Sequence, residues 1–218
     1  MRSAGHSAPR PTAQKILLIN RPGAPQSSIL GGQLMPIDPK SDIVPFDAAN
    51  DALGGDFTAR LNMDLREEKG WSYGVGGNER LLPHAASYIV SAPVQADRTG
   101  EALAELNSQV RAFLSTDGVK PDELTRTVAK SINELPGQFE SAGAVISAMM
   151  YMDLLDRPDN YYETLPGKYR ALTTATADQA IRSAIDPNGF TWIVVGDAGK
   201  IRPQLDKLGL PIEVTEAP

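Results

Sequence analysis

The hydrophobic pattern is clearest between residues 53 and 77, where a helical repeat gives way to a strand-like one. Leu53, Phe57, Leu61 and Leu65 recur every four residues, which places them along one face of a helix. From residue 71 the sequence WSYGVGG alternates larger and small residues, the two-residue period of a strand. Gly70 stands where the period changes, and we expect it to end the helix.

The start and the middle of this helix are less sharply defined. We expect it to begin at Asp42 or Pro45, to run to about Glu68, and to have a candidate break at Gly54-Gly55. Two glycines inside a helix cost about 1 kcal/mol each relative to alanine. Either a kink or a close backbone approach by a neighbouring element would explain them, and the sequence leaves both explanations open.

Two polar side chains flank the change from helix to strand. Arg66 lies in the last turn of the predicted helix, where a cation also suits the negative end of the helix dipole. Tyr73 lies on the predicted strand, residues 71–79. Because the two elements meet at one corner, a guanidinium and a phenol hydroxyl are expected to project from the same place.

The remaining elements are predicted from shorter patterns. Further strands are expected at residues 16–20, 26–35, 86–94 and 190–195, with an edge strand at 212–214. Further helices are expected at residues 99–115, from 121, at 141–155, at 159–172 with a break at Pro166-Gly167, at 176–185 after a Thr176/Gln179 capping box, and at 199–208. Residues 81–85 would join two strands by a loop longer than a two-residue turn.

Strands, then consecutive helices, then a returning strand is an α+β order. We therefore predict a two-layer α/β sandwich, with one mostly antiparallel sheet and the helices packed on one of its faces. Residues 15–218 are expected to form this single domain. Residues 1–14 carry Ser, Ala, Pro and His without periodicity and are predicted to be a flexible leader or linker.

Composition narrows the functional classes. The 218 residues carry a formal net charge of −6 and have a pI near 5.0, which gives no basic face for nucleic acid. No apolar run approaches the ~20 residues that span a bilayer. The absence of cysteine excludes disulfides and thiol chemistry and suits either the periplasm or the cytoplasm. We expect a soluble protein.

A longer motif surrounds Arg66 and Tyr73. The run LGG-x-F-x-x-R-L-N-x-x-LREEKG-x-SYG, together with RPGAPQSSI at residues 21–29, resembles the second homologous domain of the pitrilysin/insulinase-type zinc peptidases, which include the mitochondrial processing peptidase. The resemblance covers roughly residue 10 to the end and implies the same two-layer α/β domain. Subunits of this family usually contain two such domains, so we expect the chain to be a fragment.

The chain is not expected to hold the zinc of that family. Its histidines are His6, in the leader, and His84, in a loop without a carboxylate within four residues. The family's H-x-x-E-H motif, with two imidazoles one helical turn apart, is absent. We therefore predict no cofactor in this chain and zinc in a homologous partner subunit or domain. The pair Tyr161-Tyr162 is another candidate recognition patch, although one buried and one exposed ring is the commoner outcome.

The resemblance gives Arg66 and Tyr73 a role that the pattern alone does not. From the pattern, Arg66 would pair with Asp64, Glu67 or Glu68 at the surface, and Tyr73 would pack as an ordinary strand aromatic. In the zinc peptidases, an Arg and a Tyr at this seven-residue spacing face the zinc-bearing half. Arg66 and Tyr73 would then hold the peptide carbonyl and stabilise its negative charge. Ser72 and Gly74 are weaker candidates for peptide contact.

The resulting hypothesis is the substrate-binding, transition-state-stabilising half of a two-part zinc metallopeptidase that acts on peptides in a heterodimer. The domain is not expected to be active alone. An alternative from another class is a catalytically inactive scaffold, because the same family includes subunits that serve assembly. A free-standing peptide-binding module is a third, weaker option.

Overall fold

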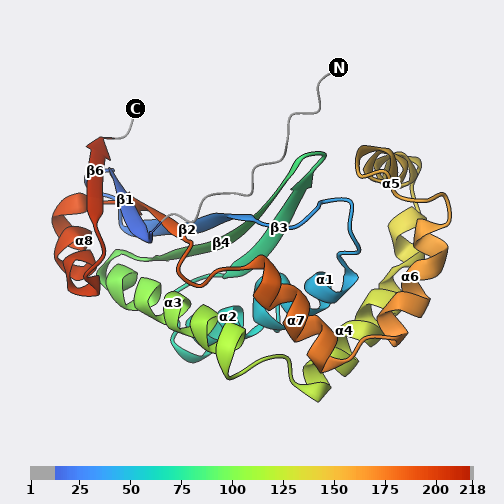
Figure 1. Ribbon diagram of the computed structural model, residues 1–218. Coiled ribbons are helices and arrows are strands. Elements are labelled where there is room, and N and C mark those ends of the chain that lie inside the picture. The colour runs from blue at the N-terminus through green and yellow to red at the C-terminus, as the bar shows by residue number, and fades with distance from the viewer. Residues whose placement is uncertain (1–12, 217–218) are drawn as a thin grey trace.

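Six strands form one open sheet in the computed structural model, which describes residues 13–216 (Figure 1). The strands are β1 (Lys15–Asn20), β2 (Gln26–Met35), β3 (Gly76–Leu82), β4 (Ala85–Gln95), β5 (Thr191–Gly196) and β6 (Ile212–Glu216). Their spatial order is β3-β4-β2-β5-β1-β6. β1 pairs in parallel with β5 and β6, and the other three pairs are antiparallel, so the predicted mostly antiparallel sheet is confirmed.

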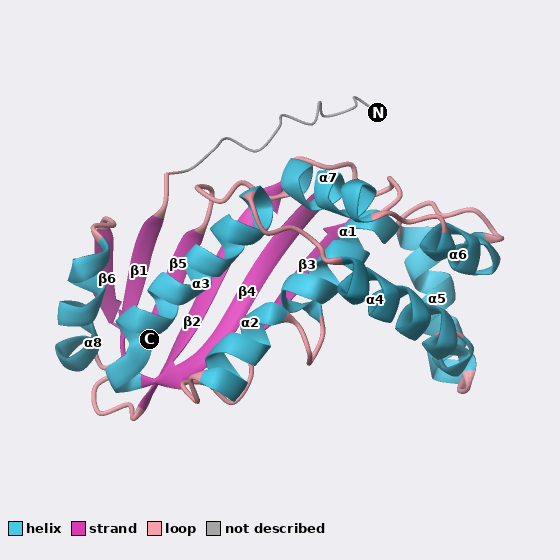
Figure 2. Ribbon diagram, turned by 90° about the horizontal axis from the view of Figure 1, so that it is seen from below, coloured by secondary structure: helices cyan, strands magenta, loops and turns pink. Residues whose placement is uncertain are grey.

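The helices cover one face of this sheet. They are α1 (Val44–Asn50), α2 (Arg60–Asn62), α3 (Thr99–Ser115), α4 (Pro121–Glu134), α5 (Ala142–Leu154), α6 (Tyr161–Arg170), α7 (Thr174–Ala184) and α8 (Ala198–Leu205). Figure 2 shows α2, α3 and α7 lying across the sheet, whereas α4, α5 and α6 extend past its β3 edge. The predicted two-layer architecture is confirmed.

The core lies between the sheet and the helices because alternate strand residues point toward the helical layer. On β4 these are Tyr88 and Val90, and on β5 they are Trp192 and Val194, all fully buried. Trp192 stacks on Phe190 with ring centroids 5.3 Å apart. Opposite Trp192 on β2 stands Gly31, where a Cβ would lie 2.4 Å from Trp192 Cζ3. A glycine is therefore required there by close packing rather than by a turn.

The other face of the sheet carries no helix over its central strands (Figure 1). Leu17, Ile193 and Leu30 form an apolar row across β1, β5 and β2 at paired positions. Further along the same face, Leu34 is 57% exposed and Ile89 is 40% exposed. This helix-free face is apolar enough to pack against another protein surface.

The first predicted helix differs most from expectation. α1 continues as a π-helical turn (Asp51–Gly55), and the chain then leaves the helical path before α2 begins at Arg60. The break thus follows the glycine pair. A Cβ on Gly54 would lie 2.8 Å from the backbone nitrogen of Gly77 on β3, so close backbone approach explains that glycine. Phe57, in the break, is 61% exposed and does not join the predicted apolar stripe.

Three shorter expectations were also wrong in detail. The β3–β4 hairpin closes by a two-residue turn, Pro83-His84, because Leu82 pairs with Ala85. α6 runs through Pro166 without a break. The capping box of α7 is formed by Thr173 and Thr176, three residues earlier than the predicted pair. Residues 1–12, with most of the predicted leader and His6, lie outside the described residues.

Candidate functional site

Arg66 lies at the end of the helical segment that follows the break. α2 passes into a π-helical turn (Met63–Glu68), and Arg66 is in its last turn, as predicted. The segment ends at Gly70, whose φ of +64° belongs to the left-handed region that glycine adopts readily. The Trp71 N–H then donates to the Leu65 carbonyl, 2.9 Å away, which closes the helix end.

The guanidinium of Arg66 lies over an aromatic ring and beside a carboxylate. It lies over the exposed ring of Phe57, 4.5 Å from the ring centroid. Its Nε is 3.5 Å from Glu67 Oε1, and 35% of the side chain is exposed. Stacking occupies the flat face of a guanidinium, while the N–H donors lie in its plane. The ion pair with Glu67 is the surface pairing that the pattern alone predicted. Within residues 13–216 the guanidinium makes no hydrogen bond, so its N–H groups can still bind an acceptor.

Tyr73 lies in the connection between this segment and β3 rather than on a strand. β3 begins only at Gly76, so the predicted strand start at residue 71 was wrong. Ser72 makes an isolated bridge to Val94 and ties the connection to the end of β4. The Tyr73 side chain is 82% exposed and makes no hydrogen bond or ring contact to the rest of the described chain. Its hydroxyl therefore points to solvent as an unused donor.

Ser72 and Gly74 shape this connection. The Ser72 hydroxyl accepts from the Gly74 N–H at 3.2 Å and lies within donating distance of the carbonyls of Gly74 (3.0 Å) and Pro93 (2.5 Å). Lys69, next to Gly70, forms an ion pair with Asp64, and its Nζ lies 5.5 Å from the Trp71 ring centroid. Burial alone would lower the pKa of Lys69, but the hydrogen bond to Asp64 leaves it raised, so Lys69 stays charged.

Asn62 joins the two parts of the site, and sequence reasoning assigned it no role. Its Nδ2 donates to the Phe57 carbonyl at 2.6 Å, and its Oδ1 accepts from the Val75 N–H at 3.0 Å. One buried carboxamide thus connects the residue under Arg66 with the connection that carries Tyr73. The sequence feature that could have identified Asn62 is its place in the R-L-N part of the motif, where a polar residue directly follows the apolar Leu61.

Zinc does not fit the described residues. Among residues 13–216 no group of three His, Cys, Asp or Glu side chains is arranged to hold a metal ion. His84 is the one histidine in that range and lies in the β3–β4 turn. In the same part of the chain, no helix combines the length and apolar character needed to cross a membrane.

Comparison with solved structures finds the same fold. A peptidase M16 inactive domain from Pseudomonas fluorescens matches with a TM-score of 0.75 and 22% identity over 88% of this chain and 45% of that one. The periplasmic protease PqqL from Escherichia coli matches with a TM-score of 0.70 and 17% identity over 86% of this chain and 21% of that one. This chain therefore spans less than half of either structure.

A lone domain matches over nearly its whole length. An inactive peptidase domain from Bordetella parapertussis has a TM-score of 0.64 and 15% identity, over 79% of this chain and 93% of that one. No curated protein matched the sequence. Residues 4–131 match the family described as the peptidase M16 inactive domain, and they include the motif around Arg66 and Tyr73. The chain belongs to this family of inactive domains of zinc-protease-like proteins.

Proposed function

We propose that this domain is the substrate-binding, transition-state-stabilising half of a two-part zinc metallopeptidase. The zinc is carried by a homologous domain or subunit with the H-x-x-E-H motif, and the substrates are peptides. The observation that carries the proposal is that two donors of the family motif make no hydrogen bond within the described chain. Tyr73 is exposed, and Arg66 is half-buried with an ion pair to Glu67.

These two groups suit a peptide carbonyl. Phe57 fixes the guanidinium of Arg66, so its in-plane N–H donors are oriented before a ligand arrives. The Tyr73 hydroxyl adds a second donor of different geometry. Donors placed in advance around an oxygen that gains negative charge stabilise the transition state more than the ground state. Arg66 and Tyr73 are therefore assigned to the carbonyl, and Ser72 and Gly74 to backbone contact with the peptide.

A partner is supported by the helix-free face of the sheet. The half-exposed Leu34 and Ile89 on this face would gain from burial against another domain. Since the described residues do not fit zinc, hydrolysis itself is assigned to that partner. A periplasmic site of action is supported by the periplasmic protease among the structural neighbours. The absence of cysteine suits the periplasm and the cytoplasm equally.

The test is a peptidase assay on the full-length protein co-purified with its zinc-bearing homologue. Arg66→Ala and Tyr73→Phe are each expected to lower kcat/KM for a fluorogenic peptide by about 10²-fold, with zinc content and assembly unchanged. Arg126→Ala is the matched control, because Arg126 is exposed on α4 and makes only an ion pair with Asp122. Unchanged activity in both variants would refute the clamp and favour the assembly scaffold.

A further inference from the structure

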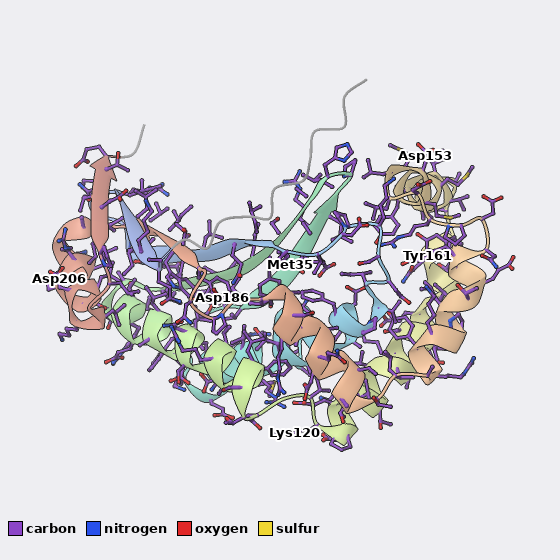
Figure 3. All side chains as sticks on the ribbon, viewed as in Figure 1. Met35, Lys120, Asp153, Tyr161, Asp186 and Asp206 are labelled. Atoms are coloured by element: carbon purple, nitrogen blue, oxygen red, sulfur yellow. The ribbon has the colours of Figure 1, made fainter. Side chains whose placement is uncertain are left out.

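A cavity lies between α1, α4 and α6. Its volume is about 320 Å³, within the range of small-ligand sites. α5 contributes Tyr151 to its wall, and α6 contributes Tyr161, Tyr162 and Tyr169. In Figure 3, Tyr161 lies where α6 begins, below α5. None of the residues proposed to bind peptide lines this space.

One side of the cavity is aromatic. The Tyr161 and Tyr162 rings meet edge to face with centroids 5.1 Å apart, and Tyr151 lies 6.3 Å from Tyr161. Burial raises the pKa of Tyr169 to about 12, so this phenol stays neutral at physiological pH. Neutral phenol rings present negative faces that attract cations and cover alkyl chains.

The other side is acidic and short of partners. Asp47, Asp51 and Glu134 line it, and Asp47 Oδ1 is buried without a hydrogen-bond partner in the described chain. Burial, then repulsion from Glu79, Asp51 and Asp42, raises the pKa of Asp47 well above its usual range, although Arg157 opposes the shift. Burial also raises the pKa of Asp51.

The cations of the chain compensate this acidic side only in part. Lys130, which also lines the cavity, forms its ion pair with Asp56 outside it and lowers the pKa of Asp51 only through charge. Arg157 donates to the carbonyls of Pro39, Lys40 and Ser41, lies 5.3 Å from the Tyr161 ring centroid, and makes no hydrogen bond to Asp47. Asp47 Oδ1 therefore still lacks a donor within the described chain, and a buried carboxyl group without a partner is costly until a charged donor arrives.

This chemistry selects one class of ligand. Three carboxylates exclude an anion, and within residues 13–216 no acidic group has the arrangement of a metal site. We propose that the cavity binds an organic cation, a primary ammonium or guanidinium on a short alkyl chain, with Asp47 and Asp51 pairing its charge and the tyrosine rings covering its chain. The source is either a Lys or Arg side chain of a peptide or a free polyamine. The proposal stands independently of the peptidase function.

The test is calorimetric titration of the full chain with butylammonium and butylguanidinium, using butanol as the neutral control. The cations are expected to bind at least 10-fold more tightly than butanol, and more weakly as pH falls and the carboxylates gain protons. Asp51→Asn should weaken cation binding about 10-fold. Asp153→Asn, which changes an exposed carboxylate on α5 outside the cavity, should leave it unchanged (Figure 3).

Two further measurements separate an effect on folding from an effect on binding and identify the source of the cation. Asp47→Asn should abolish cation binding while the domain unfolds at the same or a higher temperature, so loss of binding cannot be attributed to misfolding. Titration with Nα-acetyl-lysine methylamide and with putrescine then ranks the side-chain source against the free amine. Binding of butanol as tight as that of the cations, or unchanged cation binding in Asp51→Asn and Asp47→Asn, would overturn the proposal.

Discussion

Replacing Asn62 should uncouple the two halves of the candidate peptide site. Asn62→Ala removes the acceptor of the buried Val75 N–H and the donor to the Phe57 carbonyl. An orphaned buried N–H costs about 1–3 kcal/mol, and the lost bond to the more accessible Phe57 carbonyl adds about 1 kcal/mol. We therefore expect the free energy of unfolding to fall by about 2–4 kcal/mol, which for a domain of this size lowers Tm by roughly 5–15 °C.

Urea denaturation followed by circular dichroism measures this loss. The matched control is Asn78→Ala, which removes an exposed carboxamide from β3 and should change stability by less than about 0.5 kcal/mol. In the assembled enzyme, Asn62→Ala should also lower kcat/KM, because Phe57 and the connection carrying Tyr73 lose their common anchor. A loss of stability no larger than that of Asn78→Ala would show that the carboxamide does not hold these segments together.

Further predictions concern packing, charge and capping. Gly31→Ala should destabilise the domain by about 3 kcal/mol, since its Cβ would overlap the buried Trp192 ring. The control Gly32→Ala should leave stability unchanged, because a Cβ there meets no atom within 4 Å. The midpoints of urea denaturation of the two variants give the comparison. Asp47→Asn should stabilise the domain at pH 7 and not at pH 3. A carboxyl group with a raised pKa in the folded state costs stability only as pH rises above its unfolded pKa of about 4. Unfolding measured at both pH values checks the sign. Ser141→Ala should weaken α5 by about 1 kcal/mol and Ser141→Gly by a few tenths, seen as faster amide exchange in that helix.

Where periodicity and boundary signals agreed, the sequence was sufficient to predict an element. α3 occupies residues 99–115 as expected, and its stripe of Leu103, Leu106, Val110 and Phe113 is buried. Pro121 begins α4, as expected from proline's fixed φ and missing N–H. Such local rules require no knowledge of the rest of the chain.

The errors came from tertiary context. The candidate break at Gly54-Gly55 is confirmed, but the apolar stripe through Phe57 is wrong. Asp56 is extended and its carboxylate accepts from the Thr58 N–H at 2.8 Å, which turns the chain and leaves Phe57 outside the stripe. Pro166 stays inside α6, where its neighbour Leu165 is buried in the cluster between α1 and α6. Packing overrode the local breaker in that case.

The candidate peptide site was predictable only in part. The motif identified Arg66 and Tyr73, and the structure leaves Tyr73 exposed and Arg66 half-buried. The ring under Arg66 and the Asn62 bridge depend on where the chain turns, which periodicity did not reveal. The acidic and aromatic cavity could not be foreseen at all, because its residues come from separate helices whose packing is decided by the whole fold.

The position of β1 has a consequence for synthesis on the ribosome. β1 lies between β5 and β6, so both of its edges stay unpaired until the chain has been made past Thr191. β2, β3 and β4 are complete by Gln95 and can pair much earlier. Such distant pairing is slow, and unpaired edges invite aggregation. The sheet therefore stays unfinished from the synthesis of β1 until β5 and β6 have been made.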